Sequence, residues 1–247
     1  MPIKALLFDL MGTCCDWKSS IQPKLASIPV LSARLSDAEI VQLATDWRAG
    51  FFEEIHARFC AGAEPEDIDV THRRVLDRLL AERGIGLEEC GDGDRSALVR
   101  SWHWQLAWPD TVDAIERLRK EYMVVVLANG TTRLQMDIVK SSGIPFHSLF
   151  SSQLLGSTKP DPAIYRKALD LLQIQPDECV MVAAHAYDLR AAKEVGMRTV
   201  YVHRSTEDVD EDMDVVRRDV DLFLTADQGG KGPLEQLADL MGVLFVD

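Results

Sequence analysis

The chain has 247 residues, of which 47% are hydrophobic and 27% are charged. This composition is typical of a globular protein and is too apolar for a disordered one. Lys and Arg number 27 against 40 Asp and Glu, which gives a net charge of −13. Such a charge argues against nucleic acid or an anionic membrane as the main partner. A small anionic substrate is compatible with it where a local basic cluster overrides the overall field.

The first residues and the cysteines indicate the compartment. The run MPIKALLFDLMG predicts a buried strand rather than a signal peptide, because Asp9 interrupts its apolar residues. No uncharged apolar stretch has the length of a membrane span. The five cysteines, an odd number, show no metal-ligand spacing and predict reduced thiols. We therefore expect a cytoplasmic protein.

Apolar runs along the chain predict the strands of a parallel sheet. They are nearly continuous rather than alternating, which is typical of strands that helices cover on both faces. Helical patterns lie between them, and this alternation predicts a doubly wound, Rossmann-like α/β core. The predicted strands are Ile3–Phe8, Tyr122–Leu127, Cys179–Ala184, Thr199–Val202 and, more weakly, Leu222–Leu224, and the predicted helices are Thr111–Glu121, Thr132–Ser141, Asp161–Leu172 and Tyr187–Val195.

Residues 17–104 have a different pattern, with helical periodicity and no convincing strand. We interpret them as a helical cap domain that is inserted into an α/β core of residues 1–16 and 105–247. Pro109 and Asp110 mark the return to the core, because Pro and Asp favour the start of a helix. The predicted cap helices are Ala38–Cys60, Thr71–Arg83 and Arg95–Trp102.

Two further stretches are assigned structural roles. Trp102, Trp104 and Trp108 are expected to pack in the core or between the cap and the core, rather than to form a cage for a ligand. The acidic stretch Glu207–Asp214 is expected to be a solvated loop, which is the usual state of a run of like charges.

Polar residues follow the predicted strands where each strand ends. In open parallel sheets, ligands bind beyond the carboxyl ends of the strands. We therefore expect the polar side chains after these strands to converge on one edge, together with a lysine from the run STKPDP. They are Asp9, Thr13, Asn129, Thr131, Lys159, His185 and Asp188.

The chain resembles the haloacid dehalogenase superfamily. The segments FDLMGT, LANG, KPDPAIY and VAAHAYDLRAA, which begin at residues 8, 127, 159 and 182, occur in the order of the four motifs of that superfamily. The similarity covers nearly the whole chain and is strongest to the L-2-haloacid dehalogenases, which carry a helical cap after the first motif. It implies an α/β core with an inserted cap.

The resemblance also implies roles for the residues at the sheet edge. Asp9 would be a nucleophile that forms an ester with the substrate. Lys159 would keep Asp9 ionised and oriented, and Thr13 would form a hydrogen bond near it. Either Asp188 or His185 would activate the water that hydrolyses the ester. The alternative role of Asp188 is to orient Lys159, and the alternative role of His185 is structural.

Two positions distinguish between the reactions of this superfamily. Its phosphatases carry an acid two residues after the nucleophile to protonate the leaving alkoxide, and here this residue is Met11. Its metal-dependent members carry an acidic residue four positions before the last motif Asp, and here this residue is Ala184. A halide leaves without a proton, so the pattern favours a metal-independent and cofactor-free hydrolysis of short 2-haloalkanoic acids.

The substrate-binding residues follow from the same resemblance. Arg48 in ATDWRAGFF matches the cap arginine that contacts the departing halide, and Asn129 matches a halide-binding amide. Met11 replaces an aromatic residue found at that position, and Tyr165 matches a tyrosine of the active site. Ala128 stands where the dehalogenases usually have Ser, which predicts a different contact with the substrate carboxylate.

Two other functions stay open on the sequence alone. A phosphatase with a weakened Mg²⁺ site would require phosphate release that depends on Asp9, and a binding protein of this fold would bind halocarboxylates without releasing halide. From the family resemblance we also expect the protein to form a homodimer.

Overall fold

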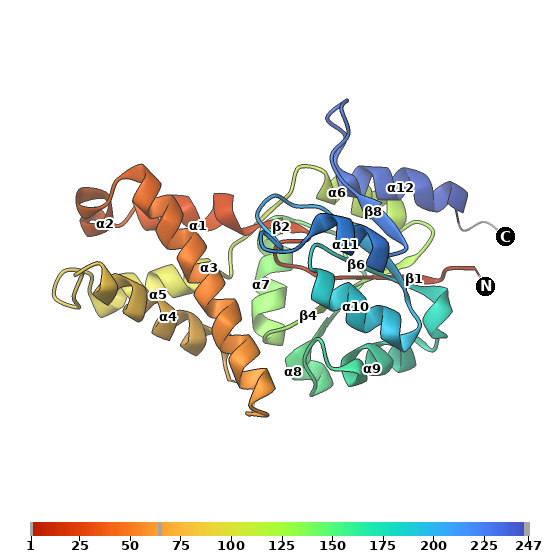
Figure 1. Cartoon of the computed structure of the whole chain (residues 1–247), viewed down its shortest axis with the longest axis horizontal. Coiled ribbons are helices and arrows are strands. Elements are labelled where there is room, and N and C mark those ends of the chain that lie inside the picture. The colour runs from red at the N-terminus through yellow and green to blue at the C-terminus, as the bar shows by residue number, and fades with distance from the viewer. Residues whose placement is uncertain (1, 64–65, 245–247) are drawn as a thin grey trace. The chain divides into compact units, whose positions relative to one another are not determined.

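The computed structural model describes residues 2–63 and 66–244. The chain divides into two compact units, one formed by Met1–Asp16 and Leu106–Asp247 and the other by Trp17–Gln105. The first unit is built on a parallel sheet, and the second consists of helices (Figure 1). Among the described residues, no helix combines the length and the apolar character that crossing a membrane requires.

Over the part of the first unit that the structure describes, the sheet has six parallel strands in the order β5-β4-β1-β6-β7-β8. Strand β1 lies at its centre, and Phe8 pairs with Val126 of β4 and with Val182 of β6. Every residue of β1 is buried, as its continuous apolar run requires of a strand with helices on both faces. The strands are β1 (Ala5–Phe8), β4 (Met123–Ala128), β5 (Ser148–Ser151), β6 (Cys179–Ala183), β7 (Arg198–Val202) and β8 (Leu222–Leu224), with a separate small pair of β2 (Cys15–Asp16) and β3 (Leu106–Ala107).

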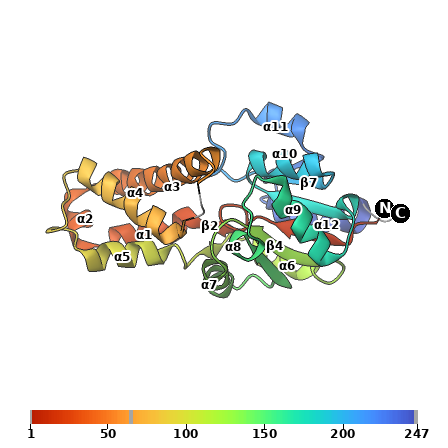
Figure 2. The same cartoon turned by 90° about the horizontal axis from the view of Figure 1, so that it is seen from below.

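Helices cover both faces of this sheet, which confirms the predicted fold class. One face packs against α9 and α10 through a core that includes Leu7, Met181 and Leu189, and α6 and α12 lie side by side across the sheet from α9 (Figures 1 and 2). The helices are α6 (Thr111–Leu118), α7 (Thr132–Ser142), α8 (Ser152–Leu155), α9 (Pro162–Leu172), α10 (Ala186–Val195), α11 (Met213–Asp219) and α12 (Pro233–Leu244), with a short 3₁₀ turn at Pro176–Glu178.

The ends of these helices follow from their sequences. Helix α7 begins where the Thr131 side chain accepts a hydrogen bond from the Leu134 N–H at 3.1 Å, and it ends at Gly143 in the left-handed conformation. Helix α9 begins at Asp161, whose side chain accepts from the Ala163 N–H at 2.8 Å. These caps set the positions of the loops that carry the polar residues of the sheet edge.

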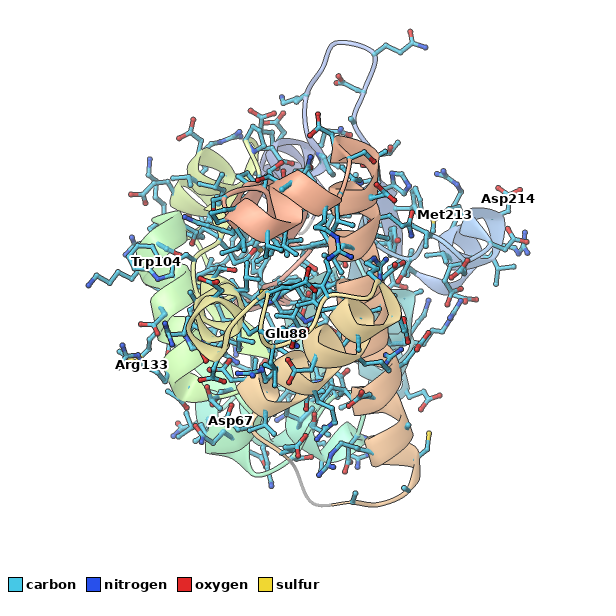
Figure 3. All side chains as sticks on the ribbon, turned by 90° about the vertical axis from the view of Figure 1, so that its left-hand side faces the viewer. Asp67, Glu88, Trp104, Arg133, Met213 and Asp214 are labelled. Atoms are coloured by element: carbon cyan, nitrogen blue, oxygen red, sulfur yellow. The ribbon has the colours of Figure 1, made fainter. Side chains whose placement is uncertain are left out.

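In its described residues, 17–63 and 66–105, the second unit contains five helices and a core of aromatic side chains. Trp47 lies edge-on to the ring of Trp102, with 5.3 Å between ring centroids, and its indole donates a hydrogen bond to the carbonyl of His72. The expectation for Trp104 is wrong, because its side chain is 65% exposed at the surface (Figure 3). The helices are α1 (Trp17–Ala26), α2 (Pro29–Arg34), α3 (Asp37–Cys60), α4 (Ile68–Glu82) and α5 (Asp92–Ser101).

His72 of α4 is buried among these rings. It is stacked between Phe51 and Trp102, at centroid distances of 4.0 and 4.5 Å. Within the described parts of the chain, neither ring nitrogen has a hydrogen-bond partner. Burial, together with the nearby charge of Arg48, holds the pKa of His72 well below its usual range, so the ring is neutral in the folded protein.

This histidine should make the protein less stable in acid. A group whose pKa is lowered by folding destabilises the folded state as the pH falls below its unfolded value of about 6.5, because only the unfolded chain takes up the proton. We expect His72→Phe to raise the free energy of unfolding by roughly 1–3 kcal/mol at neutral pH, since it removes two unsatisfied nitrogens. The gain should grow on acidification. Urea unfolding of both proteins over that range measures it, and a gain that is constant with pH would contradict it.

Candidate active site

The carboxylate of Asp9 lies at the end of the central strand β1 and is the centre of a cluster of polar side chains. Its backbone N–H still donates to the carbonyl of Val182 in the neighbouring strand, at 3.0 Å, which fixes its position relative to β6. The Asp9 side chain is buried. The side chains described below as its contacts belong to the first unit.

Three side chains contact the Asp9 carboxylate. Lys159 Nζ donates to Oδ1 at 2.8 Å, and Thr13 Oγ1 donates to Oδ2 at 2.6 Å. His185 Nδ1 lies 3.2 Å from Oδ2. Burial by itself would raise the pKa of Asp9, but the Lys159 ammonium and His185 outweigh it and hold that pKa well below its usual range. Asp9 is therefore an ionised carboxylate in a buried site.

Lys159 connects Asp9 to a second carboxylate. Its ammonium also donates to Oδ2 of Asp188, in the first turn of α10, and the lysine side chain is almost completely buried. Burial alone would lower the pKa of Lys159, but Asp188 and Asp9 raise it above its usual value, so the amine stays charged. The hydroxyl of Tyr165 donates to Oδ1 of Asp188 at 2.6 Å. Both oxygens of Asp188 thus bind partners, which fits a residue that orients Lys159.

Asn129 holds the loop that carries Lys159. Its side-chain oxygen accepts from the Lys159 backbone N–H at 2.8 Å, and its side-chain nitrogen donates to the Lys159 carbonyl at 3.0 Å. Thr13 is held in a similar way, since its hydroxyl accepts from the backbone N–H of Ala184 at 2.9 Å. Side chains of one motif are therefore hydrogen-bonded to the backbone of another, which limits the freedom of the nucleophile and its lysine.

The structure also brings in a residue that the sequence reasoning missed. Glu207 was expected to lie in a solvated loop, and this is wrong: it is buried, and its Oε2 lies 2.8 Å from Nε2 of His185. The approach depends on Gly12, which has a φ of +88° and on which a Cβ atom would lie only 2.5 Å from the Glu207 carboxyl. The glycine after Met11 was the available signal, because it indicates that another group comes close to the backbone.

The two predicted residues still to be placed are Met11 and Arg48. Met11 is half-buried on the loop after β1 and forms an isolated bridge with Cys15. Arg48 belongs to the second unit, where its buried guanidinium lies 4.3 Å from the centroid of the Phe52 ring and 5.6 Å from that of Trp17. Its helix, α3, places the cation on an aromatic surface.

A Mg²⁺ ion at this edge of the sheet would need carboxylate oxygens directed toward it. The oxygens of Asp9 bind Lys159, Thr13 and His185, and Ala184 offers no side-chain donor atom. The ammonium of Lys159 donates to both Asp9 and Asp188, so an oxygen of each carboxylate already binds a cation. Residues 2–63 and 66–244 contain no group of three or more His, Cys, Asp and Glu side chains suited to a metal. This arrangement of donors does not fit Mg²⁺.

Comparisons with known proteins show what the chain is similar to. A family model described as haloacid dehalogenase-like hydrolase matches residues 3–196. (S)-2-haloacid dehalogenase 4A of Burkholderia cepacia is 27% identical over 205 residues, which cover 82% of this chain and 84% of that protein.

Solved structures give the same result over a longer stretch. An L-2-haloacid dehalogenase is 30% identical with a TM-score of 0.81, covering 97% of this chain and 99% of its own. A defluorinating L-2-haloacid dehalogenase is 29% identical with a TM-score of 0.81, covering 98% of this chain and 96% of its own. These similarities confirm the resemblance found in the motifs.

Proposed function

Because the chain belongs to the haloacid dehalogenase-like hydrolase family, we propose that it hydrolyses the carbon–halogen bond of short 2-haloalkanoic acids without a metal ion. The observation that carries this proposal is the Asp9 carboxylate, which is ionised, buried and 2.8 Å from the Lys159 ammonium. The dehalogenase names of the similar proteins support the same reaction class.

In the first step, Asp9 attacks C2 of the haloacid. A carbon–oxygen bond forms as the carbon–halogen bond breaks with inversion, and the halide leaves with the bonding electrons. Chloride and bromide are weak bases, so the step needs no proton donor, and Met11 beside the nucleophile is compatible with it. By the family resemblance, Arg48 and Asn129 receive the halide, while Met11 and Tyr165 belong to the substrate pocket. The substrate is a small anion, and the net charge of −13 makes these local cations and donors necessary.

In the second step, water attacks the carbonyl carbon of the Asp9 ester. The acyl carbon–oxygen bond breaks, the 2-hydroxy acid leaves and the carboxylate is restored. We assign water activation to His185, whose Nδ1 lies 3.2 Å from the Asp9 carboxyl. Asp188 is assigned to orient Lys159, because its oxygens bond to Lys159 and Tyr165.

A phosphatase is less compatible with these residues. An alkoxide is a strong base and leaves poorly without a proton, which Met11 cannot supply. A binding protein without activity would not require the buried cluster of Asp9, Lys159 and Asp188, in which two carboxylates share one ammonium.

Oxygen labelling tests the proposal directly. We expect a single turnover of 2-bromopropionate in ¹⁸O water to place the label in the Asp9 side chain, because water attacks the ester carbonyl and not C2 of the substrate. Label found only in the 2-hydroxy acid would refute the covalent intermediate. Mass spectrometry of the peptide that contains Asp9 distinguishes the two.

The same preparation tests the dependence on metal. Halide release from fluoroacetate, chloroacetate and 2-bromopropionate should be unchanged by a chelator, and phosphate release from phosphate monoesters should be absent. Fluoroacetate is included because one similar structure is of a defluorinating enzyme. Halide release that a chelator abolishes and Mg²⁺ restores would contradict metal independence.

A further inference from the structure

His185 lies between two buried carboxylates, one at each nitrogen of its ring. Nδ1 is 3.2 Å from Oδ2 of Asp9, and Nε2 is 2.8 Å from Oε2 of Glu207. The other oxygen of Glu207 accepts the Thr206 hydroxyl at 2.9 Å. These contacts all lie within the first unit.

Two other titratable side chains, Asp208 and Tyr187, lie near this histidine. Asp208, on the same loop as Glu207, accepts from the Ala186 N–H at 2.6 Å and from the Tyr201 hydroxyl at 3.3 Å. The ring of Tyr187, on α10, has its centroid 5.8 Å from that of His185. The carboxylates in contact with the His185 ring are thus Asp9 and Glu207, and the Lys159 ammonium binds the other oxygen of Asp9. Asp9 is the one that the proposed reaction would neutralise.

A ring with an anionic acceptor at each nitrogen carries a proton on both nitrogens. Burial alone would lower the pKa of His185, but the hydrogen bonds to Asp9 and Glu207 raise it to about 10. In the free enzyme the ring is therefore an imidazolium ion, which has no lone pair with which to accept a proton from water. The group proposed to activate water is inactive as a base while Asp9 is ionised.

We infer that esterification of Asp9 is the event that turns His185 into a base, and that Glu207 holds the resulting neutral ring with its proton on Nε2. The inference rests on the proposed function, because it requires the Asp9 ester. When Asp9 becomes an ester it loses its charge, and the Nδ1–H of His185 loses its ionic acceptor. That proton then leaves for the solvent, and the Nδ1 lone pair faces the ester.

Protons and bonds balance over the cycle. The alkylation step releases halide, and the ring then releases one proton. Neutral His185 accepts a proton from the attacking water and returns it to the departing alkoxide, which leaves as the hydroxyl of the 2-hydroxy acid. The Asp9 carboxylic acid then protonates His185, which restores the starting ion pair. The sum is haloacid plus water giving hydroxy acid, halide and one proton, so this proton is released before hydrolysis rather than after it.

Glu207 acts in this scheme as a positioning residue. A carboxylate accepts a hydrogen bond from Nε2–H and cannot donate one, so it fixes the tautomer whose lone pair is on Nδ1. A glutamine at this position can either accept or donate, and it would no longer select between the two tautomers.

A rapid-mixing experiment with 2-bromopropionate and a pH indicator tests the inference at neutral pH. In the first turnover, the wild-type enzyme should release a proton together with bromide, ahead of the 2-hydroxy acid. His185→Asn should release bromide in the same burst but the proton only with the hydroxy acid, and should hydrolyse the ester about 10²–10⁴-fold more slowly. Glu207→Gln should slow hydrolysis by roughly 10-fold while keeping the bromide burst.

The matched control is Asp210→Asn, which removes an exposed carboxylate from the same loop and should change neither burst. A bromide burst without a proton burst in the wild type would overturn the inference and leave the proposed function intact. Hydrolysis of the ester by Glu207→Gln at the wild-type rate would have the same consequence. Absence of halide release from the wild type would instead refute the proposed function, and the inference with it. Circular dichroism of each variant checks that it is folded. If a variant does not fold, the proton burst of the wild type still tests the inference.

Discussion

Replacing Asp9 by asparagine should abolish halide release from 2-haloacids, with a loss on the order of 10⁴-fold or more. The carboxylate is the proposed attacking group, and a neutral amide oxygen is a much weaker nucleophile toward C2. The amide oxygen of the variant would still accept a hydrogen bond from Thr13, so the fold of the loop after β1 should survive. Ion chromatography of the released halide measures the loss.

Two variants make this result specific to the position of the carboxylate. Asp9→Glu keeps the charge but moves it by one methylene from Lys159 and Thr13, and we expect a loss nearly as large. Asp113→Asn, in the exposed first turn of α6, should retain wild-type activity. An Asp9→Asn enzyme that releases halide at the wild-type rate would show that another group attacks the substrate.

Lys159→Met should cost about 3–5 kcal/mol in the free energy of unfolding, besides activity. The Lys159 ammonium is the cation shared by the buried Asp9 and Asp188, and its loss would leave two carboxylates without their common counter-charge. Urea unfolding followed by circular dichroism measures the change. Lys193→Met removes a half-exposed lysine paired with Asp221, and should change stability by no more than about 1 kcal/mol.

The loss should depend on pH in a definite direction. In the wild type the pKa of Asp9 is lowered by folding, so its contribution is present above the unfolded value of 3.8 and is lost as the pH falls below it. Burial raises the pKa of Asp188, and without the Lys159 ammonium it favours the protonated form further, so Lys159→Met should lose stability as the pH rises through this folded pKa. The difference between the two proteins should therefore grow from acid to neutral pH. An equal difference at all pH values would show that Lys159 stabilises by packing alone.

The sequence predicted the sheet well because its central strands are continuous apolar runs. Strand β5 was missed because the segment SLFS has a serine at each end and is only partly buried, so neither pattern nor composition distinguishes it. The short helices α1 and α2 were missed for a related reason, since Pro23 and Pro29 interrupt the pattern that marks a helix.

The sequence predicted those residues of the candidate site that follow directly after a strand. Asp9, Asn129 and His185 each follow a strand, and parallel strands end at one edge of a sheet. Glu207 lies outside that rule, because it comes from a loop beyond β7 that folds back to the Gly12 backbone. An acidic stretch is ordinarily solvated, and the sequence of this stretch does not indicate that one of its carboxylates contacts a histidine. The stacking of His72 on Phe51 was likewise not predictable, because a single histidine on a helix forms no periodic pattern.

Strand β1 is synthesised before both of the strands with which it pairs. Its register partners are in β4 and β6, and the whole helical unit lies between β1 and β4 in the chain. On the ribosome that unit, whose contacts are closer in sequence, can fold while Ala5–Phe8 remains an apolar segment with unpaired edges. The nascent protein therefore carries an aggregation-prone stretch until β6 has emerged, and we expect its yield in cells to depend on chaperones that shield such segments.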